Sequence, residues 1–100
     1  MIVYNVTVKI DKAVHDEWLQ WMKSTHIPEV LATGYFVSNR MCRILGQDDS
    51  DGITYAIQYD ALSIEDVETY HKEFAPALQK EHTERYKNKV VAFRTLMAQV

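Results

Sequence analysis

Apolar and polar residues alternate along two stretches of the chain, residues 2–10 and residues 53–60. In both stretches Ile, Val and Tyr fall on one face and mainly polar residues fall on the other. A period of two with many β-branched residues is typical of strands buried on one face. Residues 35–45 and 90–97 are predicted to form two further strands, and the turn-rich segment 46–52 precedes the 53–60 strand.

Apolar residues recur every three or four positions between residues 13 and 23, which predicts an amphipathic helix opened by Asp11. Pro28 is expected to interrupt this helix, because the residue before a proline resists helical dihedral angles. Residues 28–33 are then predicted to form a separate short helix that ends at Gly34.

A second helical region follows residue 63. Ser63 and Asp66 resemble a capping box, with Asp in place of the usual Glu. An apolar stripe continues beyond them, and Pro76 is expected to kink the helix or split it in two. Asn88 can close it before the last strand.

The two halves of the chain therefore share the order strand–helix–strand. Two crossovers of this kind predict an α+β, ferredoxin-like βαββαβ fold with a four-stranded sheet in the order 4-1-3-2 and both helices on one face. One hundred residues suit a single domain spanning 1–100.

Helices on one side leave the other face of the sheet open. That face is either solvated, as antiparallel and mixed sheets tolerate, or packed against a second subunit to form a barrel. On the two central strands it would carry Val3, Asn5, Thr7 and Lys9 beside Thr54, Ala56, Gln58 and Asp60.

Composition narrows the classes of partner. The net charge is −3, and the Lys and Arg residues form no basic cluster, so no nucleic-acid partner is expected. No segment has the pattern of a signal peptide or a membrane span, so a cytoplasmic protein without a membrane partner is expected. Cys42 is the only cysteine, which leaves no intramolecular disulfide, and it is expected to be a small buried side chain in its strand.

Three longer runs carry a resemblance to a known family. They are WLQWMKSTHIPEVLATGYF from Trp18, TYAIQY from Thr54 and APALQKEHTE from Ala75, accompanied by YNVTV near the start and VAFRTL near the end. Together these runs resemble the DUF4286 family of uncharacterised bacterial proteins, over nearly the whole chain.

That family in turn resembles the dimeric α+β-barrel superfamily, which includes antibiotic-biosynthesis monooxygenases, haem-degrading enzymes and muconolactone isomerases. The resemblance implies a ferredoxin-like fold and a homodimer joined sheet to sheet. It transfers no reaction, because fold and function separate freely in this superfamily.

His26 is the first candidate for chemistry. It ends a Trp-rich helix just before Pro28, where an imidazole could face a pocket between helix and sheet and act as a general acid or base. Alternatively, its ring binds backbone carbonyls at the helix end, where a cation is favourable.

His71 and His82 lie on the second helical region, where haem-binding relatives carry a proximal histidine. Neither has a second ligand three or four positions away, and the bend at Pro76 disturbs their relative phase. Structural roles are therefore expected, with no metal and no cofactor.

Polar residues inside strands form a further group. They fit either a hydrogen-bonded dimer seam or a pocket wall that orients a polar ligand, and an arginine buried among them would need a carboxylate or an anion. Aromatic residues near them fit either the core or a cavity lining. The candidate ligand-binding residues are Asn5, Trp21, Tyr55, Gln58, His82 and Arg94, with Thr95 considered for the seam.

Two functions of different classes follow. The first is a homodimeric domain that binds a small molecule or a partner protein. The second is a cofactor-independent monooxygenase- or isomerase-like enzyme in which His26 moves protons and Trp21, Tyr55 and Arg94 shape the substrate site. The enzyme predicts a cavity of about 300 Å³ or more beside His26, whereas the binding domain predicts a filled core.

Overall fold

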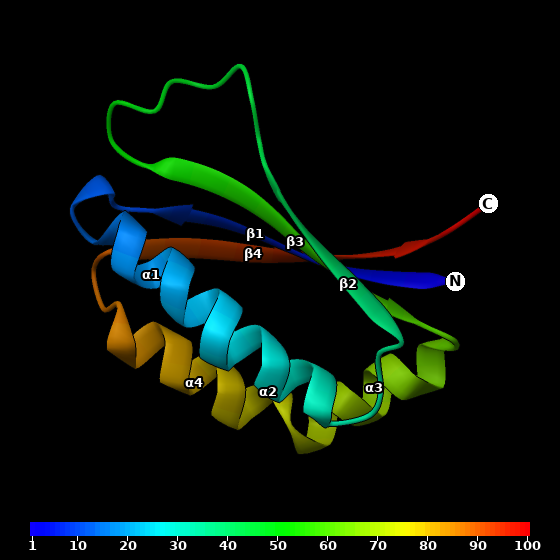
Figure 1. The fold of residues 1–100 in the computed structure, drawn as a ribbon. Coiled ribbons are helices and arrows are strands. Elements are labelled where there is room, and N and C mark those ends of the chain that lie inside the picture. Colours follow the sequence, from blue (N-terminus) through cyan, green and yellow to red (C-terminus); the bar gives the residue numbers. More distant parts are fainter.

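A computed structural model describes residues 1–100 and places all the helices on one face of a four-stranded antiparallel sheet (Figure 1). The strand order β2-β3-β1-β4 confirms the predicted ferredoxin-like fold. The strands are β1 (Ile2–Ile10), β2 (Ser38–Arg43), β3 (Ile53–Ala61) and β4 (Val90–Ala98). The helices are α1 (His15–Trp21), α2 (Ile27–Ala32), α3 (Ile64–Glu73) and α4 (Ala75–Arg85).

Strand β1 is central and sets which side chains face the helices. It pairs with β3 and β4 along its whole length, so that Val6 lies between Ile57 and Arg94. Tyr4 and Val8 share that face and are buried beneath the helices. Residues opposite one another in an antiparallel pair point to the same side of the sheet, so Arg94 belongs to the helix-covered face.

The expected break between the first two helices does not occur. A short 3-10 turn, Lys12–Val14, leads into α1, and a π-helical turn, Met22–His26, joins α1 directly to α2. The amide of Ile27 bonds the carbonyl of Met22 five residues back. We attribute the continuity to this wider turn, which accommodates Pro28 without ending the helix.

Strand β2 spans Ser38–Arg43 and is shorter at both ends than the predicted 35–45. Phe36 is buried instead, with its ring 5.3 Å from that of Tyr59 and 4.8 Å from that of Tyr70. Burying a large aromatic ring releases more free energy than extending an edge strand by two residues.

The second helical region is divided as predicted. Helix α3 ends at Glu73 and α4 begins at Ala75, with Pro76 in the first turn of α4. Ser63 caps α3 by accepting a hydrogen bond from the amide of Asp66. Asn88 adopts a left-handed φ of 64° in the turn before β4.

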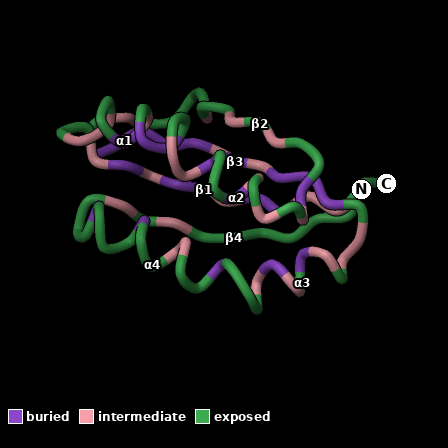
Figure 2. Tube along the Cα trace, turned by 60° about the horizontal axis from the view of Figure 1, so that its bottom comes forward, coloured by how far each residue is buried: buried purple, intermediate pink, exposed green.

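Burial concentrates in the central strands and in the inner sides of the helices (Figure 2). Trp18, Ile10 and Val67 are 0 % exposed and anchor the core. Cys42 is exposed on β2, which corrects the expected burial, because it lies opposite Ala56 on the face that the helices leave uncovered. No helix combines the length and the apolar character that crossing a bilayer requires.

Candidate small-molecule pocket

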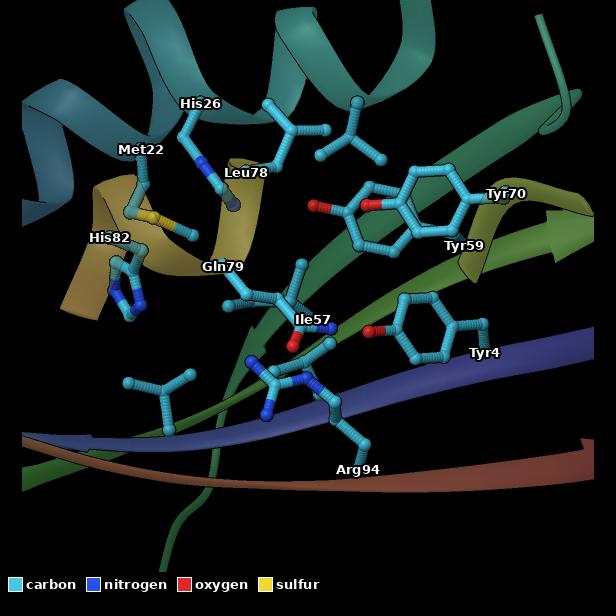
Figure 3. Close-up of a pocket in the computed structure, with 13 residues that line it drawn as sticks. Tyr4, Met22, His26, Ile57, Tyr59, Tyr70, Leu78, Gln79, His82 and Arg94 are labelled. Atoms are coloured by element: carbon cyan, nitrogen blue, oxygen red, sulfur yellow. The ribbon is translucent and has the colours of Figure 1, made fainter. Parts of the chain in front are cut away.

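A small pocket lies between the helices and the middle of the sheet (Figure 3). Its volume is about 30 Å³, which is room for one or two water molecules. Apolar side chains, together with the rings of three tyrosines, form most of its wall. Its polar lining comes from His26, His82, Arg94, Gln79, Tyr4, Tyr59 and Tyr70.

Two histidines meet at one end of this pocket. His26 ends the π-helical turn and His82 comes from α4, and their ring centroids are 5.5 Å apart. Trp21 packs on both rings, with centroid distances of 5.1 Å to His26 and 5.9 Å to His82. Trp21 therefore packs against both imidazole rings and fixes their relative position.

The hydrogen bond from Trp18 determines the tautomer of His82. The indole Nε1–H of Trp18 can only donate, and it lies 2.9 Å from Nε2 of His82. His82 is therefore neutral with its proton on Nδ1, for which the protein supplies no acceptor. Nδ1 of His26 is buried and also lacks a hydrogen-bond partner.

Burial keeps both imidazoles uncharged. It lowers the pKa of His26 to about 4, and the nearby positive charge of Arg94 contributes to that shift. Burial likewise lowers the pKa of His82 to about 4, with further contributions from His26 and Arg94. At neutral pH each ring is therefore neutral, with one nitrogen that donates a hydrogen bond and one that accepts.

Arg94 forms the opposite wall of the pocket. Its side chain extends from β4 toward Gln79 and the hydroxyl of Tyr4 (Figure 3). No carboxylate lies within 4.0 Å of its guanidinium, and no acidic residue lines the pocket. Arg94 thus carries the only formal charge in the pocket lining at neutral pH.

The tyrosines remain protonated phenols. Burial raises the pKa of Tyr4, Tyr59 and Tyr70, and Arg94 offsets part of the shift for Tyr4 and Tyr70. The hydroxyls of Tyr4 and Tyr70 point toward the space between His26 and Gln79 (Figure 3). They can therefore donate hydrogen bonds to a group placed there.

The amino-acid sequence matches the model of one protein family over its whole length. The model of the family described as "Domain of unknown function (DUF4286)" matches residues 1–100. The chain belongs to the DUF4286 family. Among curated proteins, none matches this chain.

Solved structures similar to this DUF4286 chain share its fold. A dimeric ferredoxin-like protein from an uncultured marine organism has a TM-score of 0.76 at 9% identity, covering 99% of this chain and 94% of that one. HapK from Hahella chejuensis has a TM-score of 0.72 at 10% identity, covering 100% and 93%. SnoaB, a cofactor-independent oxygenase from Streptomyces nogalater, has a TM-score of 0.67 at 14% identity, covering 98% and 92%. Identities this low establish the architecture and leave the chemistry open.

The structure brings three of the sequence candidates, His26, His82 and Arg94, into one pocket. Trp21 lies behind the histidines and does not line the pocket. Tyr55 lies outside it, with its hydroxyl 2.7 Å from Nε2 of His15.

Asn5 and Gln58 lie on the opposite, helix-free face of the sheet. Gln58 donates to Oδ1 of Asn5 over 3.3 Å and accepts from Nε of Arg40 over 2.7 Å. Arg40 also binds both carboxylate oxygens of Asp60, at 2.8 and 3.2 Å. These groups are largely satisfied within one protomer. Arg94 takes no part in this network.

Gln79 was not identified from the sequence, although a signal was present. It precedes His82 by three positions on α4, and residues three apart share a helix face. The four histidines include no cluster fit for a metal, because no group of three or more His, Cys, Asp or Glu side chains is arranged to hold one.

Proposed function

We propose that this protein is a homodimeric domain that binds a small molecule between its helices and its sheet. One observation carries the proposal. Side chains of His26, His82 and Arg94 converge on one small pocket from a π-helical turn, a helix and a strand. The buried Nδ1 of His26 has no hydrogen-bond partner, and the exposed guanidinium of Arg94 has no carboxylate partner. An unsatisfied buried polar atom is costly, so this arrangement supports a ligand that satisfies it.

A cofactor-independent oxygenase- or isomerase-like enzyme is the second candidate. The fold shared with SnoaB and the neutral imidazoles at His26 and His82 favour it. The size of the pocket counts against an aromatic substrate, because about 30 Å³ is far below the ~300–1,000 Å³ of pockets that enclose molecules of that kind. An enzyme built here would have to open the helices away from the sheet before it could admit an aromatic substrate.

The homodimer is proposed through the helix-free face of the sheet. On that face β4 carries three exposed apolar side chains, Val91, Phe93 and Met97, which are 69, 61 and 39 % exposed. An exposed apolar stripe of this kind marks an interaction surface. The cytoplasmic location and the lack of a nucleic-acid partner remain predictions from charge and pattern.

Native mass spectrometry of protein purified from its own host tests the ligand. We expect the wild type to carry a small-molecule adduct, and Gln79→Trp to lose it because the indole fills the pocket beside His26. Gln20→Trp places the same side chain on the exposed surface of α1 and should retain the adduct. An adduct that survives Gln79→Trp would overturn the proposed site, and so would the absence of any adduct if no added ligand binds the pocket either.

The same adduct distinguishes binding from catalysis. A binding domain returns the ligand with its mass unchanged after aerobic incubation. A mass change produced by the wild type and not by His26→Gln would instead favour the enzyme.

A further inference from the structure

The lining of the pocket carries positive charge and no negative charge. Arg94 from β4 faces Tyr4 from β1, Tyr59 from β3 and Tyr70 from α3, and all three phenols are neutral. The remaining titratable groups of the lining are His26 and His82, which are neutral at pH 7. Nothing in the lining balances the guanidinium.

Other arginines of this chain are paired with carboxylates. Arg40 binds Asp60 at 2.8 Å, Arg43 binds Asp49 at 2.6 Å and Arg85 binds Glu17 at 3.0 Å. Arg94 is the exception: it lines a pocket and has no carboxylate partner. A planar guanidinium matches a carboxylate or a similar planar oxyanion with two parallel hydrogen bonds.

The other polar groups add donors rather than negative charge. Because Nε2 of His82 already accepts from Trp18, its Nδ1 can only donate. The side chains of Tyr4, Tyr70 and Gln79 each supply further donors at the pocket (Figure 3). A ring of neutral donors around one cation is suited to an anionic group.

We propose that the ligand of this pocket is a small organic acid, whose carboxylate is held between Arg94 and the His26–His82 pair. This inference rests on the proposed function and names the chemical class of its ligand. A volume of about 30 Å³ admits a carboxylate and little more. The rest of a larger acid would extend past the exposed side chain of Arg94 toward solvent.

A spectroscopic signature follows from the charge. Desolvation and the positive charge of Arg94 hold the pKa of both imidazoles at about 4. An anion between them and Arg94 favours the protonated rings, so the two histidines should titrate at higher pH when it is bound. The Arg85–Glu17 ion pair lies on the outer side of Trp21 and should stay unchanged.

Histidine-ring NMR with matched ligands tests the proposal. Acetate is compared with acetamide, and propionate with propionamide, on the full chain at pH 7 and constant ionic strength. We expect the carboxylates to shift the His26 and His82 ring signals with affinities at least tenfold higher than those of the amides.

Two arginine variants complete the test. Arg94→Gln should weaken acetate binding at least tenfold with little effect on acetamide. Arg43→Gln removes the same charge from a residue outside the pocket and should leave acetate binding unchanged. Thermal unfolding of each variant verifies that it is folded.

The outcomes separate the two proposals. Equal binding of amide and carboxylate, or acetate binding that survives Arg94→Gln, contradicts the proposal of an organic-acid ligand. The proposal that the pocket binds a small molecule is unaffected by either result. A neutral adduct on host-purified protein with no response to either carboxylate leads to the same two conclusions. No adduct and no response to any of the four ligands overturns both.

Discussion

Burial and a hydrogen bond from Trp18 both keep His82 neutral. The buried indole of Trp18 donates to its Nε2, so a proton added to His82 at that nitrogen would break the bond. His26 is also kept neutral by burial, but its Nδ1 has no hydrogen-bond partner. In both cases, protonation of the histidine at low pH destabilises the folded state.

We therefore predict that the protein loses stability between pH 6.5 and 4. The unfolded chain binds a proton at each histidine near pH 6.5, whereas His26 and His82 bind one only near pH 4 when folded. In that window the unfolded state holds more protons, so the free energy of unfolding falls as pH falls, by up to about 3 kcal/mol per histidine. Urea unfolding at a series of pH values measures this slope.

A histidine variant assigns the effect. His82→Gln should flatten the slope relative to the wild type, because it removes one of the two histidines with a lowered pKa. The pKa of Asp60 is held below its usual range by hydrogen bonds from Arg40 and Ser38, so its contribution is lost only at more acidic pH. A wild-type curve that is flat from pH 6.5 to 4 would contradict the prediction.

At the scale of elements, the π-helical turn Met22–His26 determines where His26 lies. It inserts one wide turn between α1 and α2, and the continuous helix then runs to its end beside Gly34. Gly34 has a φ of 85°, a left-handed conformation that allows the chain to leave the helix toward Phe36. The positions of His26 and Val30 in the pocket wall thus depend on the backbone geometry at both ends of α2.

We predict that Gly34→Ala lowers the free energy of unfolding by about 1–2 kcal/mol, because an L side chain is strained at this φ. No atom lies within 4 Å of the added Cβ, so the cost is conformational and not a clash. Gly34→Asn is the matched control and should cost less, since Asn tolerates this region better. Chemical denaturation compares the three proteins, and an alanine variant as stable as the wild type would refute the assignment.

At the scale of the whole molecule, the sheet has two unlike faces. One is covered by helices, and the other carries the network around Arg40 and Asp60 beside the exposed stripe of β4. A lone protomer leaves Phe93 61 % exposed on that face. A second copy could cover the stripe with its own.

We predict that Phe93→Asp converts a dimer into a monomer, because a carboxylate cannot be buried unpaired in an apolar contact. Small-angle scattering and light scattering at high concentration measure the mass in solution. Leu62→Asp is the control: Leu62 is 69 % exposed in the turn after β3 and is not part of the β4 stripe, so its replacement should leave the dimer intact. A monomeric wild type at high concentration would eliminate the proposed assembly.

The periodicity of the chain determined its architecture. Strands of period two at β1 and β3, two helical regions and their order are enough to specify a ferredoxin-like sheet with one covered face. His26 and His82 were singled out by residue type and location. Their meeting was not predictable, because they lie far apart in sequence and only the packing of α4 on the π-helical turn brings their rings to 5.5 Å.

Tertiary structure also decided the side of the sheet on which Arg94 lies. Both alternating rows of β4 are largely apolar, with Val90, Ala92 and Leu96 in one and Val91, Phe93 and Met97 in the other, so its pattern favours neither face. The pairing of β4 with β1 settles it, since Arg94 stands opposite Val6 and Thr95 opposite Asn5. A shift of one residue in that register would move the guanidinium from the pocket to the open face, because successive side chains of a strand point in opposite directions.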